Sequence, residues 1–237
     1  MYLQNSTWEP WLETLLSDNT WGYLRGYNLY EWILAISLMY FVGIIFFFRA
    51  KRSKAQGIES LTWLYRAFGL FMFVHGLTRI CFVFAYWIEP YYNFFLALGY
   101  AFGACSLLLV VIVLEKYFVQ QTKHFFSIVG IILVLASFYF VIFPSASELS
   151  RTIQNFGMPV IGFAFVLLYG HVIRITVGTV RKKAIFTLLS MFVFILAVLM
   201  DSETALEANT FPLFLPPIIL ALGTILIGLS QKMEREE

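Results

Sequence analysis

The segment from Thr62 to Ile88 is apolar almost throughout, yet it contains Arg66, His75 and Arg79. As a helix, at about 1.5 Å per residue, it would extend about 40 Å, which exceeds the roughly 30 Å hydrocarbon core of a bilayer. Six further apolar segments accompany it, and the chain is 60% hydrophobic and only 13% charged. Because a soluble domain is usually about 25% charged, the sequence predicts a polytopic membrane protein.

The apolar segments predict an all-α fold with three parts. Residues 1–28 form an N-terminal extracytoplasmic segment with a short amphipathic helix that lies on the membrane surface. Residues 29–230 form a seven-helix transmembrane bundle, and residues 231–237 form a short cytoplasmic tail. The spans are expected near residues 29–49, 62–88, 92–115, 125–143, 154–178, 184–201 and 211–230. Because Pro216 and Pro217 interrupt the last span, we expect a kink there.

The distribution of lysine and arginine among the connecting segments predicts the orientation of the bundle. On one side of the membrane only Arg25 and Arg151 occur. The segments on the other side carry eleven basic residues, namely Arg49, Lys51, Arg52, Lys54, Lys116, Lys123, Arg181, Lys182, Lys183, Lys232 and Arg235. Basic residues accumulate in cytoplasmic segments. We therefore expect a multi-pass protein of the cell membrane, with its N-terminus outside and its C-terminus in the cytoplasm.

His75 and Arg79 are four residues apart and therefore share one face of their helix. Arg79 is about 13 Å from the outer end of the span, and an ionised group at that depth normally faces the bundle interior or a wet cavity. In one alternative, Arg79 reaches a carboxylate of Glu31 or Asp201, and His75 bonds to a tyrosine or serine. In the other, both side chains line an outward-opening pocket that binds an anionic or polar ligand. The residues expected around this pocket are Glu31, His75, Arg79 and Tyr100.

Two further patterns predict structural roles. Arg66 and Glu115 occur at similar depth near the inner ends of the second and third spans, so we expect an ion pair between them. Gly99 and Gly103 give the third span a small-residue face, which lets a neighbouring helix approach closely. Both packing within the chain and dimerisation would use such a face.

The sequence predicts no catalytic residue, no metal site and no bound cofactor, and it does not favour an enzyme. His75 and His171 differ in expected depth by about 10 Å, whereas the two axial ligands of a haem must meet at one depth. Cys81 and Cys105 lie inside apolar segments without a metal-ligand spacing. We expect both to pack as small hydrophobic side chains.

Seven spans with an outside N-terminus resemble, in topology alone, the microbial rhodopsins and the G-protein-coupled receptors. The first resemblance implies a lysine in the seventh span for retinal, but residues 211–230 contain none. The second implies Asp-Arg-Tyr at the end of the third span, where this chain has Leu114, Glu115, Lys116 and Tyr117. The motifs therefore assign the chain to neither family.

We expect a receptor-like sensor of a small or lipid ligand that acts through a membrane or cytoplasmic protein partner. A small transporter or channel is one alternative, although such proteins usually carry more polar residues at mid-depth. A structural or assembly subunit of a larger membrane complex is the other. Besides the lipid bilayer, the ligand and the protein partner, we expect no nucleic acid among its partners.

Overall fold

The computed structural model describes residues 27–88, 91–143, 147–201 and 214–231. These ranges contain seven α-helices and one 3-10 turn, so the predicted all-α class is confirmed. Their bounds are α2 Tyr27–Ala55, α3 Glu59–Trp87, α4 Tyr92–Tyr117, η3 Gln120–Thr122, α5 Phe125–Ile142, α6 Ser147–Ile175, α7 Gly178–Met200 and α9 Leu215–Ser230. The expected amphipathic helix, and all of the expected tail but its first residue, lie outside the described residues.

Six of these helices, α2 to α7, are long and apolar enough to cross a membrane. The seventh predicted segment contains α9, an apolar helix of 16 residues. At about 1.5 Å per residue, α9 is about 24 Å long, somewhat less than the thickness of the hydrocarbon core. The lengths and apolar compositions of these helices fit a multi-pass membrane protein.

The ends of the last helices differ from the prediction. Pro216 and Pro217 do not interrupt a longer helix but lie in the first turn of α9. A proline is tolerated there because the N–H that it lacks would have no partner within the helix. The helix α7 begins at Gly178 rather than near residue 184. Gly178 has a φ of 62°, a left-handed conformation that glycine adopts without strain, and this permits the tight turn from α6.

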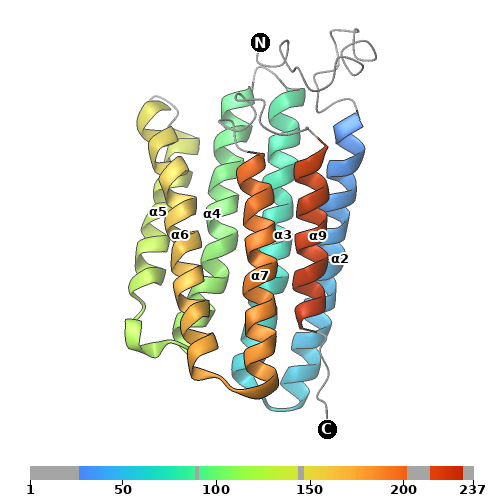
Figure 1. Ribbon diagram of the computed structural model, residues 1–237. Helices are drawn as coiled ribbons and strands as arrows, with labels where there is room; N and C mark the ends of the chain where they lie inside the picture. Colours follow the sequence, from blue (N-terminus) through green and yellow to red (C-terminus); the bar gives the residue numbers. More distant parts are fainter. Residues whose placement is uncertain (1–26, 89–90, 144–146, 202–213, 232–237) are drawn as a thin grey trace.

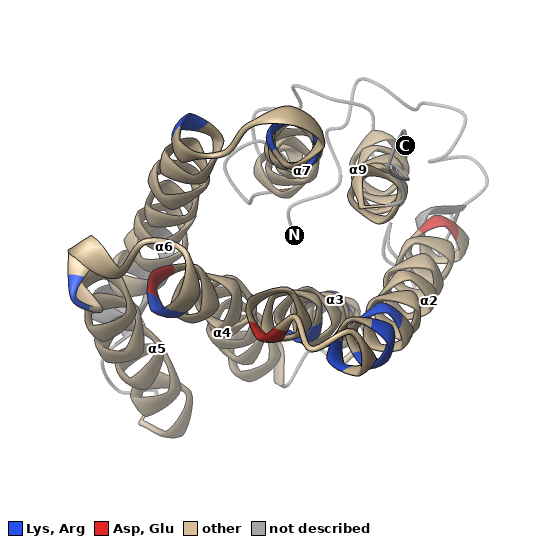
Figure 2. Cartoon of the chain, turned by 90° about the horizontal axis from the view of Figure 1, so that it is seen from below, with Lys and Arg blue, Asp and Glu red and all other residues tan. Residues whose placement is uncertain are grey.

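The helices stand side by side and alternate in direction (Figure 1), and α3 follows α2, and α7 follows α6, across connections of only a few residues. Each of α2, α3, α4, α6, α7 and α9 packs against the next, and α9 packs back against α2. Figure 2 shows that these six helices form a ring, with α5 outside it against α4 and α6. We call the end at which α2, α4 and α6 finish the basic end, because lysine or arginine occupies the last turn of all three helices.

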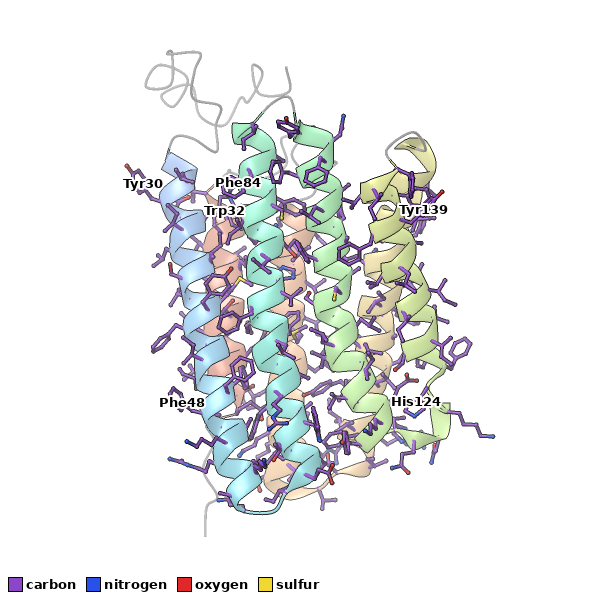
Figure 3. The ribbon with its side chains drawn as sticks, turned by 180° about the vertical axis from the view of Figure 1, so that it is seen from behind. Tyr30, Trp32, Phe48, Phe84, His124 and Tyr139 are labelled. Carbon is purple, nitrogen blue, oxygen red and sulfur yellow. The ribbon has the colours of Figure 1, made fainter. Side chains whose placement is uncertain are left out.

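The outer surface of the bundle is apolar, as contact with lipid requires. Side chains such as Tyr30, Phe48 and Tyr139 point away from their helices and are 55–76% exposed (Figure 3). Trp32, by contrast, points inward and is 3% exposed. Large exposed apolar surfaces are rare on soluble monomers, so this distribution agrees with a bundle that is surrounded by lipid.

Aromatic side chains fill the middle of the ring. Phe71 of α3 packs against Phe194 of α7, with ring centroids 5.2 Å apart. Phe68 of α3 packs edge-on against Tyr169 of α6 at 6.3 Å, and Phe165 packs against the same tyrosine at 4.8 Å. All five side chains are at most 2% exposed. These buried rings lie between two groups of polar residues, one in each half of the bundle.

Candidate functional site

The polar group farther from the basic end is built around an ion pair. Nη1 of Arg79 on α3 donates to Oδ2 of Asp201, the residue that directly follows α7. Their side chains are 2% and 12% exposed. The Arg79 guanidinium also lies over the rings of Trp32 and Phe82, at 5.0 and 5.5 Å from their centroids. A carboxylate and two aromatic faces therefore compensate this buried cation.

Of the two alternatives predicted for this region, the contacts of Arg79 and His75 match the first. Arg79 pairs with Asp201, and His75 Nδ1 lies 3.2 Å from Ser106 Oγ on α4. The other two residues expected at the pocket lie beside this cluster. Glu31 is the neighbour of Trp32 on α2, and Tyr100 of α4 packs edge-on against Phe82 with ring centroids 5.4 Å apart.

The ion pair expected between Arg66 and Glu115 is not formed between these two described residues. The Glu115 carboxylate instead accepts hydrogen bonds from the N–H of Phe126 at 3.0 Å, and from the N–H and Oγ of Ser127. These donors lie in the first turn of α5, where backbone N–H groups have no partner within the helix. The Arg66 guanidinium stacks on Trp63, 4.9 Å from its ring centroid. The ion pair was predicted only because Arg66 and Glu115 lie at similar depth in the membrane. The N–H groups at the start of α5 bind the Glu115 carboxylate instead.

The two glycines expected to support close packing both face other helices of the same chain. A Cβ at Gly99 would lie 2.4 Å from the ring of Phe82 on α3, and one at Gly103 would lie 2.6 Å from Met158 Cε on α6. These contacts are too short for a larger residue without movement of the neighbouring side chain. Packing within the bundle therefore accounts for this small-residue face.

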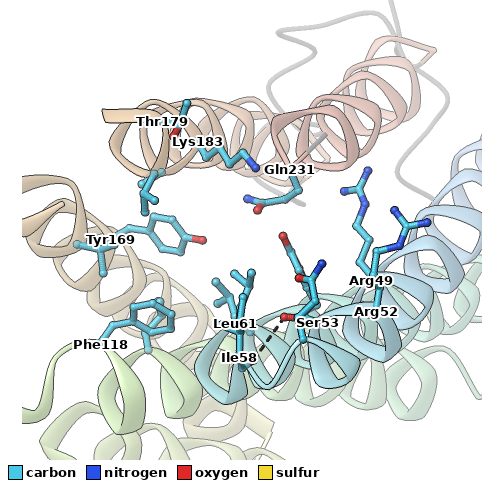
Figure 4. Close-up of a pocket in the computed structure, with 17 residues that line it drawn as sticks. Arg49, Arg52, Ser53, Ile58, Leu61, Phe118, Tyr169, Thr179, Lys183 and Gln231 are labelled. Atoms are coloured by element: carbon cyan, nitrogen blue, oxygen red, sulfur yellow. Dashed lines mark hydrogen bonds between the residues drawn. The ribbon is translucent and has the colours of Figure 1, made fainter. Parts of the chain in front are cut away.

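A cavity of about 770 Å³ lies at the basic end, inside the ring of helices. Pockets for small ligands usually measure about 300–1,000 Å³. Figure 4 shows side chains from several helices pointing into it. The residues that line it are Arg49, Arg52, Ser53, Gln56, Ile58, Leu61, Leu64, Tyr65, Leu114, Phe118, Tyr169, Val172, Thr179, Val180, Lys183, Ala184 and Gln231.

All charged side chains among the described residues that line this cavity are positive. Arg49 and Arg52 from α2 and Lys183 from α7 line it, and none of its described lining residues is aspartate or glutamate. Nη1 of Arg49 donates to the carbonyl of Gly228 on α9 at 2.9 Å, which orients the guanidinium. Three cations gathered in the described part of one wall favour an anionic ligand.

Neutral polar groups complete the cavity wall. The hydroxyl of Tyr169 points into the cavity from α6, opposite the arginines of α2 (Figure 4). Nε2 of Gln231 donates to Oγ1 of Thr187 at 2.6 Å, and Thr187 also bonds to Ser230 at 3.0 Å. This network ties the end of α9 to α7 at the cavity wall. The remaining lining is largely aliphatic, so the cavity suits a molecule with an anionic part and an apolar part.

The sequence prediction used these basic residues only to orient the bundle. A local signal for the cavity was nevertheless present, because Arg49, Arg52, Ser53 and Gln56 follow the i, i+3, i+4, i+7 spacing of one helix face. Tyr169 and Gln231 carry no comparable local signal, since only their neighbours in space make them part of a site.

The groups that line the cavity are suited to binding an anion. Within the described part of the chain, no group of three or more His, Cys, Asp or Glu side chains could hold a metal ion. The cations of the cavity can neutralise an anion, the hydroxyl and amide groups can orient it, and the aliphatic wall can cover an attached chain. Comparison of the chain with protein-family models, with curated proteins and with solved structures found no match.

Proposed function

We propose that the chain is a seven-span protein of the cell membrane, with its N-terminus outside and its basic end in the cytoplasm. The excess of lysine and arginine at one end supports this orientation. The apolar composition of α9, and its packing in the ring between α2 and α7, support a seventh span. A helix slightly shorter than the hydrocarbon core is accommodated by local thinning of the bilayer at modest cost.

In this orientation the protein acts as a receptor-like sensor of an anionic small molecule or an anionic lipid, which enters the cavity from the cytoplasmic side. The observation that carries the proposal is the set of Arg49, Arg52 and Lys183 around a cavity that has no described carboxylate in its wall. Because like charges repel one another, an anion bound among these cations stabilises the arrangement of helices that brings them together.

The cavity also supplies a route by which binding reaches a partner protein. Its lining residues come from α2, α3, α4, α6 and α7 and from the end of α9. A ligand that contacts Arg49 and Lys183 draws α2 and α7 together, and both helices end or begin at the cytoplasmic surface. A change in their separation alters the surface that a cytoplasmic or membrane partner contacts.

A small transporter is the second candidate, and one specific observation favours it. The cavity lies at the basic end, whereas the described side chains Phe71 and Phe194 and the Arg79–Asp201 pair occupy the interior of the other half of the bundle. A carrier open to one side has this asymmetry. Flux of labelled phosphate or short-chain phosphatidic acid through proteoliposomes separates a carrier from a sensor.

Ligand-dependent thermal stability of the purified protein tests the proposed binding site. The probes are inorganic phosphate, short-chain phosphatidic acid and, as a neutral comparison, short-chain phosphatidylcholine. We expect an anionic probe to raise the melting temperature of the wild-type protein. Stabilisation by phosphate indicates a soluble anion, and stabilisation by phosphatidic acid alone indicates a lipid.

Two matched triple variants make the experiment specific for the cavity. The test variant replaces the three cations of the wall with glutamine: Arg49→Gln, Arg52→Gln and Lys183→Gln. The control removes three exposed charges close by, outside the cavity wall: Lys51→Gln, Lys54→Gln and Lys182→Gln. The anion-induced shift should disappear in the first variant and persist in the second. Equal shifts in both, or no shift with any anionic probe in the wild type, would contradict the proposal.

A further inference from the structure

Apart from the cavity, a second set of polar atoms lies in the half of the bundle remote from the basic end. His75 and Arg79 are buried, with exposed fractions of 1% and 2%. Nε2 of His75, and Nε and Nη2 of Arg79, have no hydrogen-bond partner among the described residues. The two residues are one turn apart on α3, and the Cβ atoms at this spacing are about 5–6 Å apart. A single small group can therefore contact both side chains.

The hydrogen bonds on the other side of the imidazole determine which of its nitrogens carries the proton. Ser106 Oγ donates its only proton to the carbonyl of Gly103 at 2.6 Å. Its 3.2 Å contact with His75 Nδ1 therefore requires Nδ1 to be the donor. In a neutral imidazole, Nε2 then has no proton and acts only as an acceptor.

The surroundings of His75 favour this neutral ring. Phe194 and Phe71 pack against the imidazole with centroids at 4.8 and 5.7 Å. Arg79, on the next turn, is a permanent cation, and a second positive charge beside it would be unfavourable in an apolar interior. The Asp201 carboxylate is already engaged by Arg79 Nη1. His75 Nε2 therefore presents an acceptor, while Arg79 Nε and Nη2 present donors.

We infer that an O–H group, either water or the hydroxyl of a small neutral ligand, bridges Arg79 and His75 inside the bundle. Its oxygen accepts from Nε–H and Nη2–H of Arg79, and its proton is donated to Nε2 of His75. These three contacts equal the number that a buried water usually makes. A carboxylate or a fully ionised phosphate has no proton for Nε2, and Asp201 already balances the charge of Arg79. The inference narrows the ligand expected here from anionic or polar to neutral and hydroxyl-bearing.

Nitrogen NMR of His75 tests the bridge without reference to the cavity at the basic end. The chain has three histidines, so the His124→Gln/His171→Gln variant leaves His75 as the only one. With ¹⁵N-histidine in lipid nanodiscs, we expect a protonated Nδ1 and an unprotonated Nε2 whose resonance is shifted upfield by an accepted hydrogen bond. A protonated Nε2, or an Nε2 resonance at the position of a nitrogen without a hydrogen bond, would overturn the inference.

Two further variants test the parts of the argument. Ser106→Ala removes the acceptor of the Nδ1 proton, and we expect the fraction of the other tautomer to rise. Arg79→Met/Asp201→Asn removes both charges together and with them the donors that hold the bridging oxygen. The Nε2 resonance should then move toward the position of a free acceptor, and an unchanged resonance would exclude Arg79 from the bridge. If this double variant does not fold, the spectrum of the single-histidine protein decides the question.

A transfer experiment distinguishes the two sources of the O–H group. If water forms the bridge, magnetisation passes from water protons to Nε2, and the transfer persists after the protein has been delipidated. If a ligand hydroxyl forms it, delipidation removes the hydrogen-bonded Nε2 resonance. Mass spectrometry of the organic extract then contains a neutral hydroxyl compound in equimolar amount. Transfer from water protons or recovery of an equimolar hydroxyl compound supports the bridge. If neither is observed, the inference is overturned.

Discussion

Arg79 and Asp201 form an ion pair that joins α3 to the end of α7 across 122 positions of the sequence. Because the Arg79 side chain is only 2% exposed, the pair is a buried link between α3 and the end of α7. Removing one member of this buried pair should therefore cost more stability than removing one member of an ion pair at the surface.

Breaking this pair from one side should destabilise the protein strongly. Arg79→Met leaves the Asp201 carboxylate without its cation, and loss of one partner of a buried pair costs about 3–5 kcal/mol. Asp201→Asn leaves the guanidinium unpaired, with a similar cost. The Arg79→Met/Asp201→Asn double variant should lose much less than the sum of the single variants, as measured by thermal unfolding in detergent. Additive losses would mean that the two residues act independently.

Glu115 should matter for the start of α5. Glu115→Ala removes the acceptor of three hydrogen bonds, and hydrogen bonds to a charged group contribute about 1.5–3 kcal/mol each. Glu115→Gln keeps one carbonyl oxygen and should cost less, and Ser127→Ala should cost least. Hydrogen exchange of the α5 amides reports the local loss. Arg66 stacks on Trp63 instead of pairing with Glu115, so the stability losses of Arg66→Gln and Glu115→Gln should add in the double variant. Strong coupling between the two substitutions would show that Arg66 and Glu115 do interact.

A substitution at Gly223 should separate α7 from α9. A Cβ there would lie 2.9 Å from the backbone nitrogen of Phe194 and 3.0 Å from its Cα, and backbone atoms cannot move aside as a side chain can. Gly223→Ala should therefore lower stability by about 1–3 kcal/mol, the usual cost of overpacking. Gly162→Ala is the control, because nothing lies within 4 Å of the added Cβ. If both variants have the same melting temperature, the close approach of the two helices is not tight.

Accessibility of single cysteines should establish the orientation. In a Cys81→Ala/Cys105→Ala background, Lys54→Cys is exposed at the basic end and Asn93→Cys is exposed at the other. A membrane-impermeant maleimide should label Asn93→Cys in intact cells and Lys54→Cys only after permeabilisation. The reverse pattern would invert the bundle.

The same method should establish whether α9 crosses the membrane. Phe214, just before α9, is exposed, and Phe214→Cys should be labelled from outside. A protease-sensitive tag at the C-terminus should be cleaved only from the cytoplasmic side. Labelling of Phe214→Cys and cleavage of the tag from the same side would reduce the number of spans to six.

The candidate sites were predictable to different degrees. His75 and Arg79 were recognisable because polar residues stand out inside an apolar helix, and their i, i+4 spacing is local. Their partners Ser106 and Asp201 are distant in the sequence. From the expected depth in the membrane alone, Glu31 was as good a candidate as Asp201 for the carboxylate that pairs with Arg79. The cavity at the basic end was not predicted, because its residues come from segments far apart in the chain.

The sequence by itself determined that this chain forms long apolar helices suited to a membrane. That property is local, since a segment in hydrocarbon must bury its side chains in lipid and satisfy its backbone hydrogen bonds within its own helix. Only the tertiary structure decided that Arg79 pairs with Asp201, that Glu115 binds the start of α5, and that Arg49, Arg52 and Lys183 surround one cavity. Ion pairs and cavities depend on which helices are neighbours and how they are rotated, and neither is encoded in the composition of a single span.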